Sequence, residues 1–296
     1  MIIRVSVIIP VYNCADTIER AINSVFNQRF HSWEIVAVDD GSTDCSSNIL
    51  EKYGDRIKIL RQRNRGAAAA RNAGAAVATG EYLAFLDADD EWLPGKLRAC
   101  VDALDASPHA VAVYSDMLSY NGVRISPMSG SPSLHYLLKN AFALTPSATM
   151  VRREAFERCG GFADQFAPGD LAEDTFLGLK LRELGEFVHI AEPMVYFRVS
   201  GFSEAAAKYP GGHRKFARLV RKRYGRRSRG IRSEMRRYYG SLLLGTALVR
   251  AREKRIWSAS WYLLSATTVG PSFVIGCGLK KIRKATASVY HISKGV

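Results

Sequence analysis

Three carboxylates within four residues follow a short apolar run in this chain of 296 residues. Residues 82–86 are long enough for one buried strand, and Asp87, Asp89 and Asp90 come directly after them. A buried strand cannot hold this charge, so we expect the acids just past its carboxyl end, where open α/β sheets bind ligands. Crowded carboxylates repel one another unless a cation lies among them. The spacing of Asp87 and Asp89 therefore predicts a site for Mg²⁺ or Mn²⁺.

The same acids also have a simpler interpretation. They could form a solvated turn in which Asp90 caps a helix that begins near Trp92. The acidic stretch alone does not decide between a metal site and a turn, and the residues upstream supply the missing information.

Three further apolar runs precede the acidic stretch, at residues 5–9, 34–38 and 57–60. Apolar positions with helical spacing follow the first run, and a Gly-led, Ala-rich helix is expected after the third, from about residue 66. Strands that alternate with helices of this length indicate βαβ units and a mostly parallel sheet. The sequence therefore predicts an α/β fold.

Polar residues follow the first two of these strands. Tyr12 comes just after the first and could stack on a nucleotide base. Asp39 and Asp40 end the second and could accept a hydrogen bond from a base. Each has a structural alternative, a half-buried turn tyrosine for Tyr12 and a turn with a helix cap for the acids. We expect one of the two acids to bind the base and the other to hold the turn.

Four stretches together resemble family 2 glycosyltransferases with the GT-A fold. They are Val5-Ser6-Val7-Ile8-Ile9-Pro10-Val11-Tyr12-Asn13, Val38-Asp39-Asp40-Gly41-Ser42-Thr43-Asp44, Ala70-Arg71-Asn72-Ala73-Gly74, and Gly80-Glu81-Tyr82 leading to Asp87-Ala88-Asp89-Asp90. They occur in the family's order and spacing, and the likeness covers about residues 3–203. The resemblance implies a Rossmann-like, mostly parallel sheet flanked by helices, and it favours the metal site over the simple turn.

The resemblance also implies site residues. Those for the nucleotide sugar are Pro10, Tyr12, Asp39, Asp40, Arg71, Asp87 and Ala88, and those for Mg²⁺ or Mn²⁺ are Asp87 and Asp89. The family uses the position of Asp39 and Asp40 for uracil, so the donor is expected to be a UDP-sugar. Arg71 resembles the family residue near the diphosphate, and its alternative is an arginine on a helix surface.

Glu173 and Asp174 form a second acidic pair, which precedes an apolar helix. The pair matches the family's ED motif, in which the Asp is the catalytic base, so Asp174 is expected to take the proton of the acceptor hydroxyl. The alternative is a helix start that the helix dipole stabilises. Family members often carry a His after a Tyr-Arg pair further on. This chain has Tyr196-Phe197-Arg198-Val199-Ser200 instead, so no role is carried over to that position.

The remaining pattern suggests two halves of one transferase domain. We expect a nucleotide-binding half near 1–115 and an acceptor half near 116–203, with strands at 111–114, 148–151, 188–190 and 195–198. Residues 119–147 are rich in Ser, Gly and Pro and are expected to form a loop over the substrate. The five scattered cysteines lack CxxC spacing, which argues against a disulfide framework or a zinc site and favours a cytoplasmic location.

Charge separates a third region, residues 204–296, which we expect to be basic and helical. Residues 1–203 hold 20 Lys and Arg against 25 Asp and Glu, whereas the remainder holds 22 against 3. The densest run, 214–237, has interleaved apolar residues, which favours an interfacial helix on an anionic membrane. Nucleic acid is the rival partner. Residues 256–279 carry no charge, but their Ser, Thr, Gly and Pro content favours packing or interfacial helices over a membrane span.

The sequence thus predicts a metal-dependent, inverting glycosyltransferase, peripheral on the inner face of the cell membrane, that acts on a glycan or lipid-linked acceptor. One rival is a sugar-nucleotide pyrophosphorylase. That enzyme would need a Gly-rich phosphate loop after the first strand, where this chain has Pro10-Val11-Tyr12-Asn13. The other rival is an inactive binding protein docked on membrane or nucleic acid. The intact set of Asp87, Asp89 and Asp174 argues against it.

Overall fold

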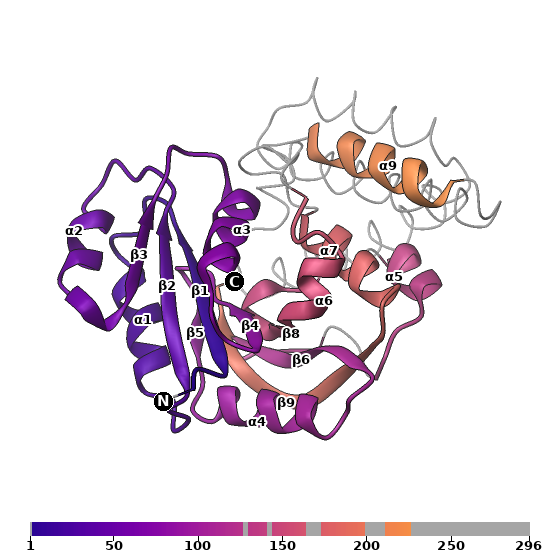
Figure 1. The fold of residues 1–296 in the computed structure, drawn as a ribbon, viewed down its shortest axis with the longest axis horizontal. Coiled ribbons are helices and arrows are strands. Elements are labelled where there is room, and N and C mark those ends of the chain that lie inside the picture. Colours follow the sequence, from indigo (N-terminus) through magenta and orange to yellow (C-terminus); the bar gives the residue numbers. More distant parts are fainter. Residues whose placement is uncertain (1, 127–129, 141–143, 164–172, 199–210, 226–296) are drawn as a thin grey trace, which may run out of the picture. The chain divides into compact units, whose positions relative to one another are not determined.

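The computed structural model describes residues 2–126, 130–140, 144–163, 173–198 and 211–225 (Figure 1). The chain divides into two compact units. The first contains residues 1–137 and 142–200, and the second contains 138–141 and 201–296. The described strands all belong to the first unit, so the fold that positions a site at their ends is the fold of that unit.

The amino-terminal part of the first unit alternates strands and helices, as the sequence predicts. Its elements are β1 (Val5–Val11), α1 (Ile18–Phe26), β2 (Trp33–Asp39), α2 (Ser46–Glu51), the 3₁₀ turn η1 (Gly54–Arg56), β3 (Lys58–Arg61), α3 (Ala67–Val77) and β4 (Tyr82–Phe85). The four strands pair in parallel in the order β3-β2-β1-β4. The predicted α/β class is therefore confirmed in this half.

Helices α1 and α3 cover opposite faces of β1. Val7 and Ile9 pack in one core with the buried side of α1, whereas the intervening Ile8 faces Gly74 of α3. A Cβ atom at Gly74 would lie 2.6 Å from Cγ2 of Ile8, which is too close for any side chain. Glycine at this position therefore lets α3 lie close against the sheet and fixes where its first turns meet the strand ends.

The second half of the first unit differs from the prediction. Its elements are β5 (Glu91–Trp92), α4 (Lys96–Asp105), β6 (Ala110–Ser119), β7 (Arg124–Ile125), α5 (Leu134–Asn140), η2 (Pro146–Ala148), β8 (Thr149–Arg152), α6 (Arg153–Arg158), α7 (Glu173–Arg182) and β9 (Glu186–Phe197). The sheet order is β3-β2-β1-β4-β8-β6-β9-β5, with β7 beside β6. Because β8 runs antiparallel to β4 and β6, and β5 antiparallel to β9, the sheet is mixed and the prediction of a mostly parallel sheet is wrong.

Two local expectations in this half are also corrected. The strands expected at 188–190 and 195–198 are one strand, β9, which bends past register shifts against β6 and reaches β5 (Figure 1). The segment 119–147 is not a loop throughout, because it contains β7, α5 and the start of η2. Local composition identified its turns but not the short elements between them.

The register of the parallel strands brings their carboxyl ends to one edge. Val11 of β1 pairs with Asp39 of β2, and Ile8 pairs with Phe85 of β4. Residues that follow these strands, including Tyr12, Asp40 and Asp87, consequently emerge at the same edge. Gly41 lies there with a φ of 78°, and a Cβ atom on it would be 3.0 Å from the backbone nitrogen of Asn64. Its lack of a side chain lets the loops after β2 and β3 meet.

The described part of the second unit contains residues 138–140, at the end of α5, and one basic helix, α9 (Gly211–Tyr224). Near its end Val220 and Tyr224 are buried one turn apart, and Arg221, Lys222 and Arg223 are exposed between them. The rest of the tail, including the uncharged segment 256–279, lies outside the described residues. Within the described ranges, none of the helices has both the length and the apolar content that a membrane crossing requires.

Candidate active site

A buried arginine joins the two acidic stretches that the sequence singles out. Arg71 of α3 is 4% exposed, and its guanidinium donates to Oδ1 of Asp87 at 2.5 Å and to Oε1 of Glu173 at 3.3 Å. Burial alone would lower the pKa of Arg71, but the nearby charges of Asp87, Glu173 and Asp174 outweigh it and raise that pKa. Arg71 is therefore a permanent cation that holds Asp87 and Glu173, which lie 16 and 102 positions from it in sequence, at one place.

The acidic turn after β4 presents its three carboxylates in different environments. Asp87 is tied to Arg71, and its backbone N–H donates to Oγ of Ser147 at 3.0 Å. Asp90 is buried, and its Oδ1 accepts the backbone N–H of Arg198 at 2.9 Å. Asp89 is partly exposed, and among the described residues no side chain pairs with its carboxylate. Asp89 is thus the acid in this turn that remains available to a ligand.

The pKa values of this turn are displaced in the direction expected for crowded acids. Burial, followed by the charge of Asp87, raises the pKa of Asp89, and the positive charges of Arg198 and Arg71 act against the rise. Burial and Asp87 also raise the pKa of Asp90, to about 8. Added positive charge would stabilise the ionised form of both groups.

Asp174 lies in the first turn of α7, beside Glu173. Its Oδ1 accepts the backbone N–H of Thr175 at 2.6 Å. Burial, and then the neighbouring charge of Glu173, raises the pKa of Asp174 to about 7. A carboxyl group with a pKa near neutrality can take up a proton during a reaction and release it afterwards, which suits a general base.

The two acids at the end of β2 hold different loops. Asp39 accepts the backbone N–H of Ser42 at 2.9 Å and the hydroxyl of Ser47, so it fixes the turn that leads to α2. Asp40 accepts Nε2 of Gln62 at 2.6 Å and the backbone N–H groups of Arg65 and Gly66 at 2.9 and 2.8 Å. Asp40 therefore fixes the loop before α3. Both acids are buried at the sheet edge where a base is expected, and the assignment of one of them to the base stays a prediction.

The other residues of the predicted donor set lie along the same edge. Pro10 is the second-last residue of β1 and pairs with Val38, and Tyr12, which follows β1, has an exposed fraction of 46%. Ala88 is buried inside the acidic turn. Arg71 is buried against Asp87 and Glu173, so the simple alternative of an arginine on the helix surface does not apply, and its contact with a diphosphate stays a prediction.

Two supporting residues were not identified from the sequence. Ser147 of η2 accepts from Asp87, and its carbonyl oxygen accepts Nε1 of Trp92 at 2.8 Å. Asn72 follows Arg71, and its amide exchanges two hydrogen bonds with the backbone of Phe162, both at 2.9 Å. Asn72 lies inside the stretch Ala70-Arg71-Asn72-Ala73-Gly74 that resembles the family, whereas a lone serine gives no local signal.

The acidic edge has features that fit a divalent cation. Within the described ranges, no three His, Cys, Asp or Glu side chains form a ready-made metal site. Two carboxylates suffice, however, when Mg²⁺ or Mn²⁺ arrives with substrate phosphates. Asp87 and Asp89 have carboxylate oxygens that would serve this purpose, and among the described residues buried Oδ2 of Asp90 and Oε2 of Glu173 have no hydrogen-bond partner. The donor set is therefore compatible with the metal that the sequence predicts.

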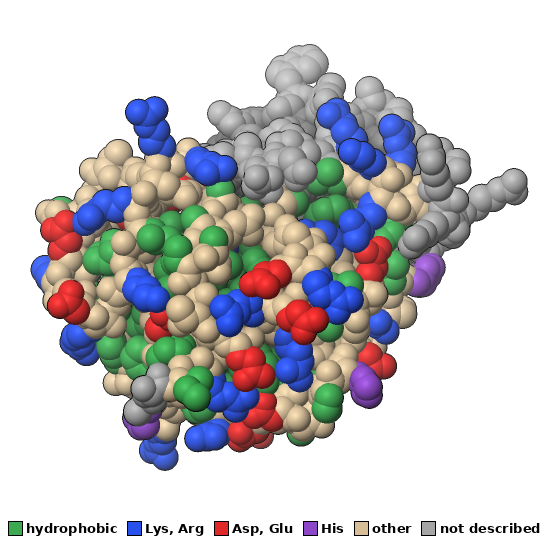
Figure 2. Space-filling model, in the orientation of Figure 1, with side chains coloured by type: hydrophobic (Ala, Val, Ile, Leu, Met, Phe, Trp, Pro, Cys, Tyr) green, Lys and Arg blue, Asp and Glu red, His purple; other side chains and the backbone are tan. Residues whose placement is uncertain are grey.

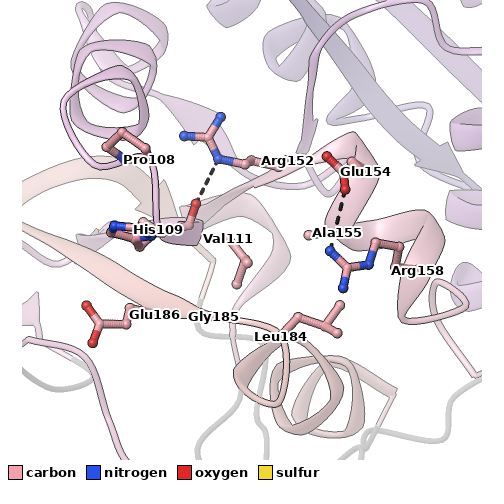
Figure 3. A pocket seen from close by; sticks show the side chains of 11 residues that line it. Pro108, His109, Val111, Arg152, Glu154, Ala155, Arg158, Leu184, Gly185 and Glu186 are labelled. Carbon is pink, nitrogen blue, oxygen red and sulfur yellow. Dashed lines mark hydrogen bonds and ion pairs between the residues drawn. The ribbon is translucent and has the colours of Figure 1, made fainter.

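A separate cavity of about 450 Å³ lies at the start of β6 and the end of β8, away from the acidic turn, around His109 and Gly185 (Figure 3). Arg152, which lines this cavity, donates to the carbonyl oxygens of Ala110, Leu104 and Ser107. Arg158 pairs with Glu154 one turn away. Both of these arginines therefore already have partners.

Comparisons with known proteins find one matching family and several similar chains. The family described as Glycosyl transferase family 2 matches residues 6–160. An uncharacterized glycosyltransferase of Nostoc sp. is 36% identical over 214 residues, which cover 67% of this chain and 65% of that protein. UDP-Glc:alpha-D-GlcNAc-diphosphoundecaprenol beta-1,3-glucosyltransferase of Escherichia coli is 34% identical over 134 residues, which cover 45% of this chain and 53% of that protein. The chain thus covers less than two thirds of either relative.

A solved structure has a similar fold. The mannosyltransferase of Pyrobaculum calidifontis, in complex with GDP-Man and Mn²⁺, superimposes with a TM-score of 0.60 at 21% identity, covering 99% of this chain and 82% of that one. At this identity the likeness concerns the fold alone.

Proposed function

Because the chain belongs to glycosyl transferase family 2, we propose that it transfers a sugar from a nucleotide sugar to a hydroxyl group of a glycan or lipid-linked acceptor, in cell-surface polysaccharide synthesis. The observation that carries the proposal is the position of Arg71, which joins the acidic turn at Asp87 to the pair Glu173-Asp174. A phosphate-binding edge and a candidate base are thereby held side by side by one buried cation. Residues near 1–115 bind the donor, and residues near 116–203 bind the acceptor.

The reaction proposed is a single displacement with inversion. The acceptor oxygen forms a bond to the anomeric carbon, and the bond from that carbon to the terminal phosphate oxygen breaks. The bonding electron pair leaves with the nucleoside diphosphate. Asp174 takes the proton of the acceptor hydroxyl as the new bond forms, and Arg71 holds Asp87 and Glu173 in position. Asp87 and Asp89 would hold Mg²⁺ or Mn²⁺, which would supply positive charge to offset the charge of the leaving diphosphate.

The donor proposed is a UDP-sugar. The Escherichia coli relative uses UDP-Glc according to its name, and the resemblance implies that Asp39 or Asp40 contacts uracil. The exposed ring of Tyr12 offers a stacking surface beside these acids. The structural neighbour is in complex with GDP-Man, so binding measurements must compare uracil and guanine nucleotides.

Thermal-shift screening of UDP-sugars and GDP-sugars, each with Mn²⁺ and with a chelator, tests the proposal. A ligand at 100 times its dissociation constant adds about 2.7 kcal/mol to the free energy of unfolding, so binding gives a measurable rise in Tm. We expect a UDP-sugar to raise Tm only when metal is present. A protein that no nucleotide sugar stabilises under either condition would instead support the alternative of an inactive binding protein on this fold.

We also propose that the basic tail docks the enzyme on an anionic membrane surface without crossing it. Acidic and basic side chains are interspersed on the visible face of the first unit (Figure 2), whereas residues 204–296 hold 22 Lys and Arg against 3 acids. In the described part of that region, the exposed Arg221, Lys222 and Arg223 present three consecutive positive charges. Each basic residue near an acidic leaflet contributes about 1 kcal/mol.

Vesicle flotation of the full chain measures this docking. We expect binding to anionic vesicles at low salt and release at 1 M salt, because the Debye length shrinks from about 10 Å at 0.1 M to about 3 Å at 1 M. Neutral vesicles serve as the control. Binding that survives 1 M salt would indicate a hydrophobic anchor, and salt-sensitive binding to RNA without any preference for lipid charge would assign the tail to nucleic acid.

A further inference from the structure

A second pocket lies beside the acidic turn and includes none of the residues assigned to the nucleotide. It has a volume of about 350 Å³ and is lined by Arg20, Tyr120, Asn121 and Arg198. Arg20 comes from α1, Tyr120 and Asn121 from the turn that joins β6 to β7, and Arg198 directly follows β9. Because the backbone N–H of Arg198 donates to Asp90, the pocket begins next to the acidic turn.

The two arginines of this pocket differ in their ion pairing. Arg20 already has a partner, since its Nη1 lies 3.4 Å from Oε1 of Glu91, which also accepts the hydroxyl of Tyr120 at 2.8 Å. The guanidinium of Arg198 is exposed, and within the described ranges no acidic side chain forms an ion pair with it. Among the described residues that line the pocket, Arg198 is therefore a cation without an ion-pair partner, enough for one anionic group of a ligand.

An aromatic surface adjoins this cation. The ring of Tyr120 is 45% exposed and stacks on Tyr196 of β9, with ring centroids 5.8 Å apart and an interplanar angle of 23°. The guanidinium carbon of Arg20 also lies 5.9 Å from the centroid of the Tyr120 ring, and the Tyr120 hydroxyl donates a hydrogen bond to Glu91. A rigid tyrosine of this kind gives a large contact area at low entropic cost. Asn121 adds an amide that can both donate and accept.

We propose that this pocket binds an anionic group of the acceptor, a carboxylate or a phosphate next to a sugar ring, with Arg198 as the charged contact and Tyr120 as the surface beneath the ring. The identification of the ligand as the acceptor rests on the glycosyl transfer proposed above. The donor needs the strand ends around Tyr12, Asp39 and Asp40, which do not line this pocket. The acceptor must approach the same acidic turn from outside that set.

Direct binding measurements on the full chain test the pocket without relying on turnover. The probes are methyl glucuronide, N-acetylglucosamine 1-phosphate and the neutral methyl glucoside, each titrated by calorimetry with and without UDP and Mn²⁺. We expect at least one anionic probe to bind about tenfold or more tightly than the neutral one, because hydrogen bonds to charged groups are stronger than neutral ones. The comparison of the two anionic probes shows whether carboxylate or phosphate is preferred.

Three variants assign the effect to residues. Arg198→Gln removes the charge and should abolish the preference for the anionic probe, Arg198→Lys should restore part of it, and Tyr120→Ala should weaken all probes alike. Arg98→Gln is the matched control, because Arg98 is an exposed helix arginine paired with Asp102 and does not line the pocket. Arg198→Gln should lower the affinity for UDP less than it lowers the affinity for the anionic probe.

The outcomes separate this proposal from the function on which it rests. Equal binding of charged and neutral probes, or an equal loss in Arg98→Gln, would overturn the pocket assignment. A loss of UDP affinity in Arg198→Gln as large as the loss of probe affinity would also overturn it and would assign Arg198 to the donor. Failure of every nucleotide sugar to bind would instead overturn the proposed function. The preference of the pocket for an anion is measured without UDP, so that result is independent of nucleotide-sugar binding.

Discussion

Asp174→Asn is expected to lower turnover at least about 100-fold while nucleotide binding stays intact, because general base catalysis contributes about 10²- to 10⁴-fold. The amide keeps the size of the side chain and can still accept the N–H of Thr175, which the carboxylate accepts at 2.6 Å. It cannot take up the proton of an acceptor hydroxyl. Steady-state kinetics with saturating donor give turnover, and the Tm rise with UDP and Mn²⁺ gives binding.

Asp102→Asn is a suitable control for this variant. Asp102 is an exposed acid on α4 that pairs with Arg98 at 3.6 Å, so the same chemical change there should leave turnover unaltered. If Asp174→Asn lost UDP binding in parallel with turnover, the residue would support the start of α7 and would not be the base. Unchanged turnover would remove Asp174 from the mechanism altogether.

Asp89→Ala is expected to abolish metal-dependent nucleotide binding. Asp87 is held by Arg71 and Asp90 by the backbone of Arg198, so Asp89 is the acid of the turn that is available to a cation. Its pKa is raised by burial and by Asp87, which means that its ionised form gains from added positive charge. The measurement is the difference in Tm between UDP with Mn²⁺ and UDP with a chelator.

The exposed Asp55 of η1 supplies the control, and Asp55→Ala should keep the full metal-dependent shift. An Asp89→Ala protein whose shift with UDP and Mn²⁺ equals that of the wild type would show that the metal assignment is wrong. A lower Tm without any ligand would be a separate effect on stability, so each variant is compared with its own unliganded Tm.

The local elements of the first half could be predicted from the sequence, because strand and helix periods are written in neighbouring residues. The runs at 5–9, 34–38, 57–60 and 82–86 correspond to β1, β2, β3 and β4. Strand order is a long-range property. Nothing local in the run at 148–151 indicates that β8 inserts antiparallel between β4 and β6, and the sheet was therefore predicted as mostly parallel.

In the candidate site, too, local features could be predicted and long-range contacts could not. Its acids were visible because three carboxylates after an apolar run are unusual, and the four quoted stretches gave them a context. The position of Arg71 was not decided, since a helix arginine is more often exposed than buried. Its burial depends on Asp87 and Glu173, which are 16 and 102 residues away and whose charges make a buried guanidinium tolerable. Ser147 was missed for the same reason.

The central claim is that this chain moves a sugar from a nucleotide donor through the site at Asp87, Asp89 and Asp174. Its most direct test is the release of nucleoside diphosphate from a panel of UDP-sugars and GDP-sugars, followed over time with Mn²⁺ and with a chelator. The account predicts steady release from a UDP-sugar that requires metal and falls at least about 100-fold in Asp174→Asn. Release that is equal in wild type and Asp174→Asn, or that persists in chelator, would contradict it.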